Sequence, residues 1–252
     1  MDEGMAPRAL EPRRPLEMPG TDGLAGLSAD GSRDSLVMQV LSTEHFSLLT
    51  HRSLVYNEAF TRVGMFLTFV SMSFVALALL SGAVPIDQSF LATAAIVFGF
   101  DFIIGLTTFL RVGAANAEDV RVVQGMARIR HGYIELAPET QPYFTSGTYD
   151  DMAGVSKAYG VSRTPTVLAN LTYGLSTSNG MAGFVVSLVG GVFAAVTALA
   201  IGVSGAVAFV IGIVAGLAVF ALCVRWAFGN FRRTQDSLEV RFPSPPSGLD
   251  AT

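Results

Sequence analysis

The residues from Met181 to Ile201 have the sequence MAGFVVSLVGGVFAAVTALAI, which contains no charged side chain. An α-helix rises about 1.5 Å per residue, so a run of this length matches the roughly 30 Å hydrocarbon core of a bilayer. Three further apolar runs of similar length occur in the chain, at residues 63–80, 90–110 and 206–224. The sequence therefore predicts an all-α membrane protein with four transmembrane helices.

The composition agrees with a membrane protein. Of the 252 residues, 51% are hydrophobic and only 14% are charged, whereas a typical soluble domain carries about 25% charged residues. The net charge of −4 gives no support to nucleic-acid binding. Cys223 is the single cysteine and lies within the fourth run, so a disulfide within one chain is excluded.

The four runs form two pairs, and short connections at residues 81–88 and 202–205 join the members of each pair. Such connections predict two antiparallel helical hairpins. Basic residues flank the other ends of the runs, and cytoplasmic flanks are enriched in Lys and Arg. They are Arg52, Arg62, Arg111, Arg121, Arg128, Arg130, Lys157, Arg163, Arg225, Arg232 and Arg233. We therefore expect a multi-pass membrane protein, with both termini and the central segment cytoplasmic.

Composition divides the chain further. Residues 1–33 contain four prolines and no apolar period, which favours a disordered tail, and residues 243–252 have the same character. The first hairpin and its cytoplasmic extension occupy residues 34–137. A linker with short helices follows at 138–180, and the second hairpin with a short extension occupies 181–242.

The cytoplasmic extension of the first hairpin is predicted to be a packed helical stalk. Its first helix runs from about Thr43 and includes Glu58 and Arg62 at the favourable i,i+4 spacing. Its second helix ends before Pro138 and carries a heptad-like seam with one polar member. The seam consists of Val112, Ala115, Asp119, Val122, Met126, Ile129, Tyr133 and Leu136. The seam either packs on the neighbouring helix of the same chain or forms an interface with another subunit or a partner.

Capping residues predict where other helices begin. Asp87 is suited to cap the second spanning helix, after Pro85 has ended the first. In the linker, Asp150 is expected to cap a short helix that ends at Ala158. A second short helix is expected from Thr164 to Tyr173.

Asp101 lies near the middle of the second apolar run. A central carboxylate costs about 2.5–3.5 kcal/mol on insertion scales, so it should face protein or water. Counting from the inner boundary places Ser71 and Ser73 at the same depth, and these serines, with Thr68 and Thr107, are the expected partners. Asp101 is either a proton- or cation-binding site on a polar pathway or a structural carboxyl group that hydrogen-bonds across the hairpin.

Small residues recur at four-residue spacing in the last two runs, where they allow helix backbones to approach closely in lipid. They are Gly183, Ser187, Gly191 and Ala195 in the third run, and Ala208, Gly212 and Gly216 in the fourth. Packing within the second hairpin is the expected use, and oligomerisation through the same residues is the alternative.

Five arginines lie at the predicted inner boundary and are expected to contact lipid phosphates. They are Arg62, Arg111, Arg225, Arg232 and Arg233. A generic anchoring role is the simpler interpretation, and a specific site for an anionic lipid is the alternative.

The sequence contains no nucleotide-binding loop, dinucleotide fingerprint, nucleophile elbow or zinc-protease motif. His51, His131 and the nearby glutamates lack a firm metal-ligand spacing. No cofactor, metal or catalytic residue is therefore predicted, and the protein is not expected to be an enzyme.

Three stretches resemble a group of uncharacterised bacterial four-span integral membrane proteins. They are STEHFSLL from Ser42, YNEAFTRVGMFL from Tyr56 and RIRHGYIELAPE from Arg128. The similarity covers roughly residues 42–145. It implies a bacterial inner-membrane location and brings no assigned activity.

The expected function is that of a non-enzymatic membrane protein that assembles with itself or with a protein partner through the stalk. The alternative is a small transporter or pore-forming channel subunit that uses Asp101. A membrane enzyme acting on lipid lacks paired catalytic groups and ranks third.

Overall fold

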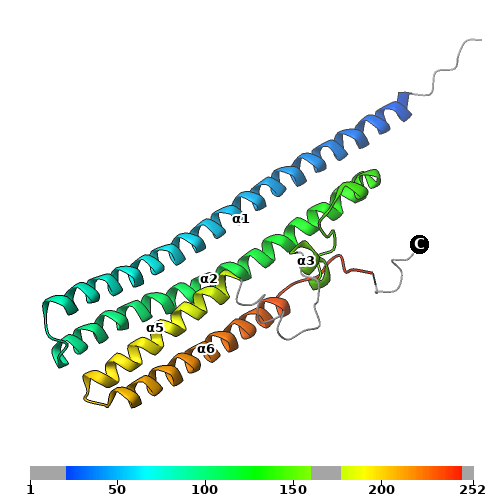
Figure 1. Ribbon diagram of the computed structural model, residues 1–252. Coiled ribbons are helices and arrows are strands. Elements are labelled where there is room, and N and C mark those ends of the chain that lie inside the picture. The colour runs from blue at the N-terminus through cyan, green and yellow to red at the C-terminus, as the bar shows by residue number, and fades with distance from the viewer. Residues whose placement is uncertain (1–20, 160–176, 246–252) are drawn as a thin grey trace, which may run out of the picture. The chain divides into compact units, whose positions relative to one another are not determined.

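The structure, a computed structural model, describes the backbone of residues 21–159 and 177–245 and the side chains of residues 31–159 and 177–245. Within these ranges every regular element is helical (Figure 1). The elements are α1 (Thr21–Ala83), α2 (Gln88–Leu136), the 3-10 helix η1 (Pro138–Tyr143), α3 (Met152–Ala158), α5 (Ser178–Ala200) and α6 (Gly205–Asp236).

Four of the described helices are long and apolar enough to cross a membrane, namely α1, α2, α5 and α6. The most apolar stretches of these helices have mean hydropathies between 2.0 and 2.9. This finding confirms the expectation of an all-α chain with four apolar helices, and it is compatible with a multi-pass membrane protein.

The helix ends follow local chemistry. The carboxylate of Asp87 accepts a hydrogen bond from the backbone N–H of Phe90 at 2.9 Å, so the predicted cap of α2 is confirmed. The helix ends at Leu136, as expected from Pro138, which disfavours helical backbone in the residue before it. Gly202 adopts φ +86° between α5 and α6, a conformation that residues with a Cβ rarely adopt.

The contacts divide the chain into two units, residues 1–40 and 41–252. In the first unit, α1 begins at Thr21, so residues 21–33 are helical where the sequence predicted disorder. Adding a residue to an existing helix costs far less than nucleating one, so a long apolar helix can extend into a sequence with little apolar pattern. Residues 1–20 lie outside the described part.

In the linker, Asp151 caps α3 by accepting the N–H of Gly154 at 2.9 Å. The prediction that Asp150 would be the cap is therefore wrong. The expected helix from Thr164 to Tyr173 lies outside the described residues. Ser244, expected to be in a disordered tail, donates its N–H and its hydroxyl to Asp151, because the carboxylate has acceptor capacity left after capping α3.

Within the second unit, the contacts of α1 with α2 run in opposite order along the two helices. Phe74 packs on Phe98, Phe66 lies against Gly105, and Arg52 pairs with Asp119. Helix α2 also packs on α5, and α5 packs on α6 (Figure 1). One apolar cluster joins all four helices through Phe66, Val70, Phe109, Ala182, Val186, Val189 and Cys223.

The predicted seam of α2 packs on α1 of the same chain over at least its first two positions. Val112 and Ala115 form a buried cluster with Val55 and Ala59 of α1. Asp119, the polar member of the seam, is also buried and faces α1.

Candidate functional site

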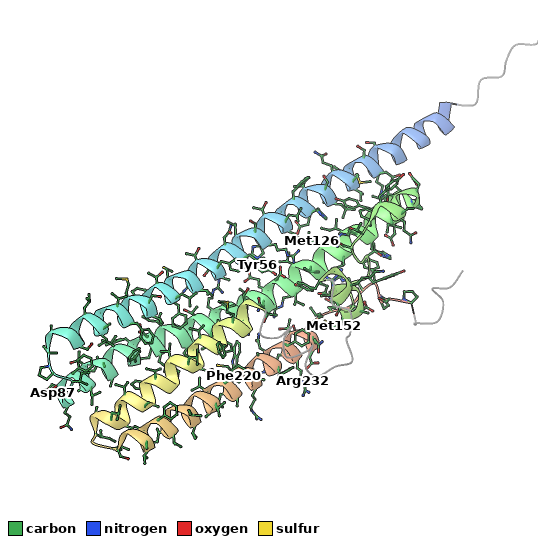
Figure 2. All side chains as sticks on the ribbon, in the orientation of Figure 1. Tyr56, Asp87, Met126, Met152, Phe220 and Arg232 are labelled. Atoms are coloured by element: carbon green, nitrogen blue, oxygen red, sulfur yellow. The ribbon has the colours of Figure 1, made fainter. Side chains whose placement is uncertain are left out.

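A buried carboxylate of α2, Asp119, gathers polar side chains from two other segments of the chain. The Nε and Nη2 of Arg52 donate to its two oxygens at 2.7 and 3.4 Å. The hydroxyl of Tyr56 donates to Oδ2 at 2.9 Å, and the hydroxyl of Tyr159, just after α3, donates to the same oxygen. In Figure 2, Tyr56 lies between α1 and α2. Both oxygens of a carboxylate that is only 3% exposed are therefore paired.

Electrostatics hold the two tyrosines and Arg52 of this cluster in one protonation state each. Burial raises the pKa of Tyr159, and the hydrogen bond to Asp119 raises it further. Burial and Asp119 act in the same direction on the pKa of Tyr56. For Arg52, burial alone would lower the pKa, but the hydrogen bond and the charge of Asp119 outweigh it and raise the value. Both tyrosines thus remain neutral donors and Arg52 remains a cation at neutral pH.

A cavity of about 510 Å³ opens beside the cluster, bounded by Tyr56 of α1 and by parts of α2, α3, α5 and α6. Amides and hydroxyls line much of it, including Asn116, Ser156 and Asn230. The side-chain oxygen of Asn179, also in the lining, is buried and has no hydrogen-bond partner among the residues that the structure describes. A cavity of this size and polarity can hold water or a small polar molecule, which would satisfy that oxygen.

A second buried carboxylate, Asp150, joins the end of α2 to the segment after α6. It is completely buried, and its oxygens accept the backbone N–H groups of Arg241 and Phe242 at 2.7 to 3.1 Å. The Nε of Arg128 donates to it at 2.8 Å. Burial alone would raise the pKa of Asp150, but these hydrogen bonds lower it. This role explains why Asp151, and not Asp150, is free to cap α3.

The same segment is held by two further contacts from α2. The amide of Gln124 donates to the carbonyls of Asp150 and Glu239, both at 2.9 Å. The ring of Phe242 stacks on His131 with centroids 4.1 Å apart. His131, considered above as a metal ligand, therefore lies in a packed structural contact.

Asp101 is buried, and its Oδ2 has no hydrogen-bond partner among the described residues. The expectation that Ser71 and Ser73 would be its partners is wrong, because no hydrogen bond joins either serine to Asp101 in the described part. Ser71 is exposed and donates to the carbonyl of Leu67 in its own helix at 2.8 Å. Such bonding to the preceding turn is common for serine within helices.

The glycines singled out for packing lie where helices meet. A Cβ built on Gly191 would lie 2.8 Å from the carbonyl oxygen of Gly212 and 3.4 Å from the Cα of Gly216. These three residues bring α5 and α6 together at backbone distance. Gly183 lies elsewhere on α5, where its Cβ position is 3.1 Å from Phe109 and 3.5 Å from Cys223.

The five boundary arginines fall into two groups. Glu58 binds both Arg62, at 3.0 Å, and Arg111, through two hydrogen bonds at 3.0 and 2.7 Å. The predicted pair of Glu58 with Arg62 is thus present, and the link to Arg111 was missed. Hydrogen bonds from Arg111 and then Arg62 lower the pKa of Glu58 to about 2. The other three arginines line a groove between α2 and α6.

Two residues of this site were predicted in part from the sequence. Asp119 was recognised as the polar member of the seam, and Arg52 as a flanking cation, but nothing local paired them. The short turn between α1 and α2 provides the missing signal, because residues equally far from it along the two helices face each other. That rule pairs Arg52 with Asp119 and Glu58 with Arg111.

Comparison of the chain with protein-family models, with curated proteins and with solved structures found no match. The resemblance to bacterial four-span membrane proteins therefore stays a prediction from the sequence.

Proposed function

We propose that this chain is a non-enzymatic, multi-pass membrane protein that assembles with a second protein chain through the outward face of α1. The observation that carries the proposal is a set of large apolar side chains on α1, before its apolar run begins at residue 63. Phe46 is 68% exposed, Leu54 is 62% exposed and Phe60 is 57% exposed. Exposed apolar groups of this size outside a bilayer are typical of interaction surfaces.

The proposal includes the arrangement in the membrane. Helices α1 and α2 form one antiparallel hairpin and α5 and α6 form the other, with both termini on the cytoplasmic side of the inner membrane. The parts of α1 and α2 outside the bilayer form a cytoplasmic stalk. The arginine-rich flanks support this orientation. A tag at either terminus should then resist protease added to intact cells, and digestion from outside would contradict the arrangement.

The outward face of α1 is the part of the stalk suited to a partner, because its inward face is occupied. Arg52, Tyr56 and Glu58 bond to α2, and Val55 and Ala59 pack against it. The seam of α2 that the sequence offered as an alternative interface lies largely in the interior, since Val112, Ala115, Asp119, Val122, Met126 and Ile129 are all buried.

Crosslinking in native membranes tests this assembly. The single native cysteine, Cys223, is buried, so Cys223→Ala provides a background without reactive thiols. In that background Leu54→Cys labelled with benzophenone maleimide should give a product on irradiation, because the photoactivated ketone inserts into C–H bonds of any neighbouring chain, whereas Ala59→Cys, buried against α2, should give none. A product of twice the chain mass indicates self-assembly, and another mass indicates a different partner. Monomers alone at both positions would contradict the proposal.

A second candidate, a small transporter or channel subunit, is favoured by Asp101. A buried carboxyl oxygen that finds no partner in the described part of the chain, inside an apolar helix, is costly. Binding of a proton or a cation would relieve that cost. Proteoliposomes that contain the wild type should then take up protons or cations, and the variant Asp101→Asn should lose this flux. Absence of flux, or flux unchanged by Asp101→Asn, would remove this candidate.

A further inference from the structure

A groove between α2 and α6 combines an apolar wall with a cluster of cations. Its volume is about 880 Å³. Phe102 and Leu106 of α2 and Leu222 of α6 belong to its apolar lining, and Arg225, Arg232 and Arg233 of α6 line it as well. Figure 2 labels Arg232 near the C-terminal end of α6.

The apolar and cationic parts of the groove lie at different depths. Phe102 belongs to the middle of the second apolar run, whereas Arg225 directly follows the fourth run. The eight residue steps from Phe102 to Leu110 correspond to about 12 Å along the helix axis. The groove therefore extends from the membrane boundary into the hydrocarbon region, with its cations at the boundary.

The three arginines differ from the other two boundary arginines in their partners. Arg62 and Arg111 both form ion pairs with the carboxylate of Glu58. No carboxylate in residues 31–159 or 177–245 lies within ion-pair distance of Arg225, Arg232 or Arg233. An uncompensated cluster of guanidinium groups favours an anion, and guanidinium is well matched to phosphate oxygens.

We propose that this groove binds an anionic phospholipid, with an acyl chain along Phe102, Leu106 and Leu222 and the phosphate against Arg225, Arg232 and Arg233. The charge complementarity selects the headgroup, and the apolar wall selects a lipid over a free anion. This assignment is independent of the partner surface on α1, since the two lie on different helices.

Trp226 provides the probe for this site. It is the only tryptophan of the chain, it lines the groove and it is partly buried. Its ring packs against Phe109 with centroids 5.2 Å apart, and its edge lies over Gly113. Bromine atoms near the carbonyl end of a bound acyl chain would lie close to this ring and quench its fluorescence.

The experiment reconstitutes the full chain in phosphatidylcholine vesicles that contain increasing fractions of brominated lipid. Brominated phosphatidylglycerol should quench Trp226 with a relative affinity about three- to tenfold above that of brominated phosphatidylcholine, as expected for a few arginines at a phosphate. Replacing all three arginines by glutamine should abolish the preference, and replacing them by lysine should largely retain it. Arg121→Gln, an exposed arginine outside the groove, serves as the matched control and should leave the preference unchanged.

Several results would overturn the proposal. Equal quenching by the two headgroups would show that the groove does not select an anion, and an unchanged preference in the glutamine variant would place the anion elsewhere. Loss of the preference on adding millimolar inorganic phosphate would indicate a site for a free anion. If the triple glutamine variant does not reconstitute, Arg225→Gln and Arg232→Gln are measured singly, and each should reduce the preference.

Discussion

Two helix contacts in this molecule are built from different chemistry. Helices α1 and α2 are joined by long side chains, with Arg52 on Asp119 and Arg111 on Glu58 at 2.7 Å each. Helices α5 and α6 are joined by backbone, with Gly191 set against Gly212 and Gly216. In water, opposite charges determine which helix faces pair with each other. In lipid, the close packing of small residues is a main source of helix association. The difference agrees with the proposed arrangement, in which the ionic contact of α1 with α2 lies in the stalk and the glycine contact of α5 with α6 lies in the bilayer.

The largest effect is expected from breaking the backbone contact. Gly191→Leu should destabilise the fold by more than about 3 kcal/mol, because even a Cβ would come within 2.8 Å of the Gly212 carbonyl and backbone cannot yield as a side chain does. The free energy of unfolding in mixed micelles provides the measurement. The matched control is Gly64→Leu on α1, whose Cβ position meets nothing within 4 Å. Equal destabilisation by the two variants would contradict a backbone contact between α5 and α6.

The next largest effect is expected at the ionic contact. Asp119→Ala should lower the free energy of unfolding by about 2–3 kcal/mol, because it leaves Arg52, Tyr56 and Tyr159 without their shared acceptor. This loss of stability is smaller than the loss expected from breaking a fully buried ion pair, since the Arg52 side chain is 32% exposed. Glu118→Ala provides the control, because its bond to His51 is on the surface and should contribute little. Similar losses in the two variants would show that the Asp119 cluster contributes no more than a surface pair.

Local sequence signals predicted the apolar helices and several of their ends. Hydropathy over about 20 residues and single capping groups are local properties, so α2 could be placed from Asp87 to Leu136. The polar clusters are not local. Whether Asp150 or Asp151 caps α3 depends on the segment after α6, which donates two N–H groups to Asp150. Depth counting placed serines near Asp101 but could not give the side-chain direction, which depends on how the helices pack.

A smaller effect is expected where α2 meets α6. Gly113→Ala should cost about 1–2 kcal/mol, because the added Cβ would lie 2.4 Å from the ring of Trp226 and the ring must shift. The variant should also shift the wavelength of the fluorescence emission maximum of Trp226, the only tryptophan. Gly229→Ala on α6 is the control, since its Cβ position is open, and alanine there should leave the emission unchanged. Identical emission in both variants would exclude the close contact of Trp226 with Gly113.

The smallest effect, and the one that separates the two contacts by their chemistry, is expected from pH. The pKa of Glu58 is about 2 in the folded chain against an ordinary value of 4.5. A carboxylate with a lowered pKa stabilises the fold above the ordinary value, and this stabilisation is lost as the pH falls from about 4.5 toward 2. The midpoint of thermal unfolding of the wild type should therefore exceed that of Glu58→Gln at pH 7, and the difference should shrink below pH 4.5. The difference should be modest, because Glu58 and both of its arginines are exposed to solvent and screened. Gly191→Ala should show a midpoint difference from the wild type that does not depend on pH over this range, since no titratable group takes part in that contact. A pH-independent effect of Glu58→Gln would mean that Arg62 and Arg111 do not hold the carboxylate ionised, and that Glu58 adds no ionic stabilisation to the contact of α1 with α2.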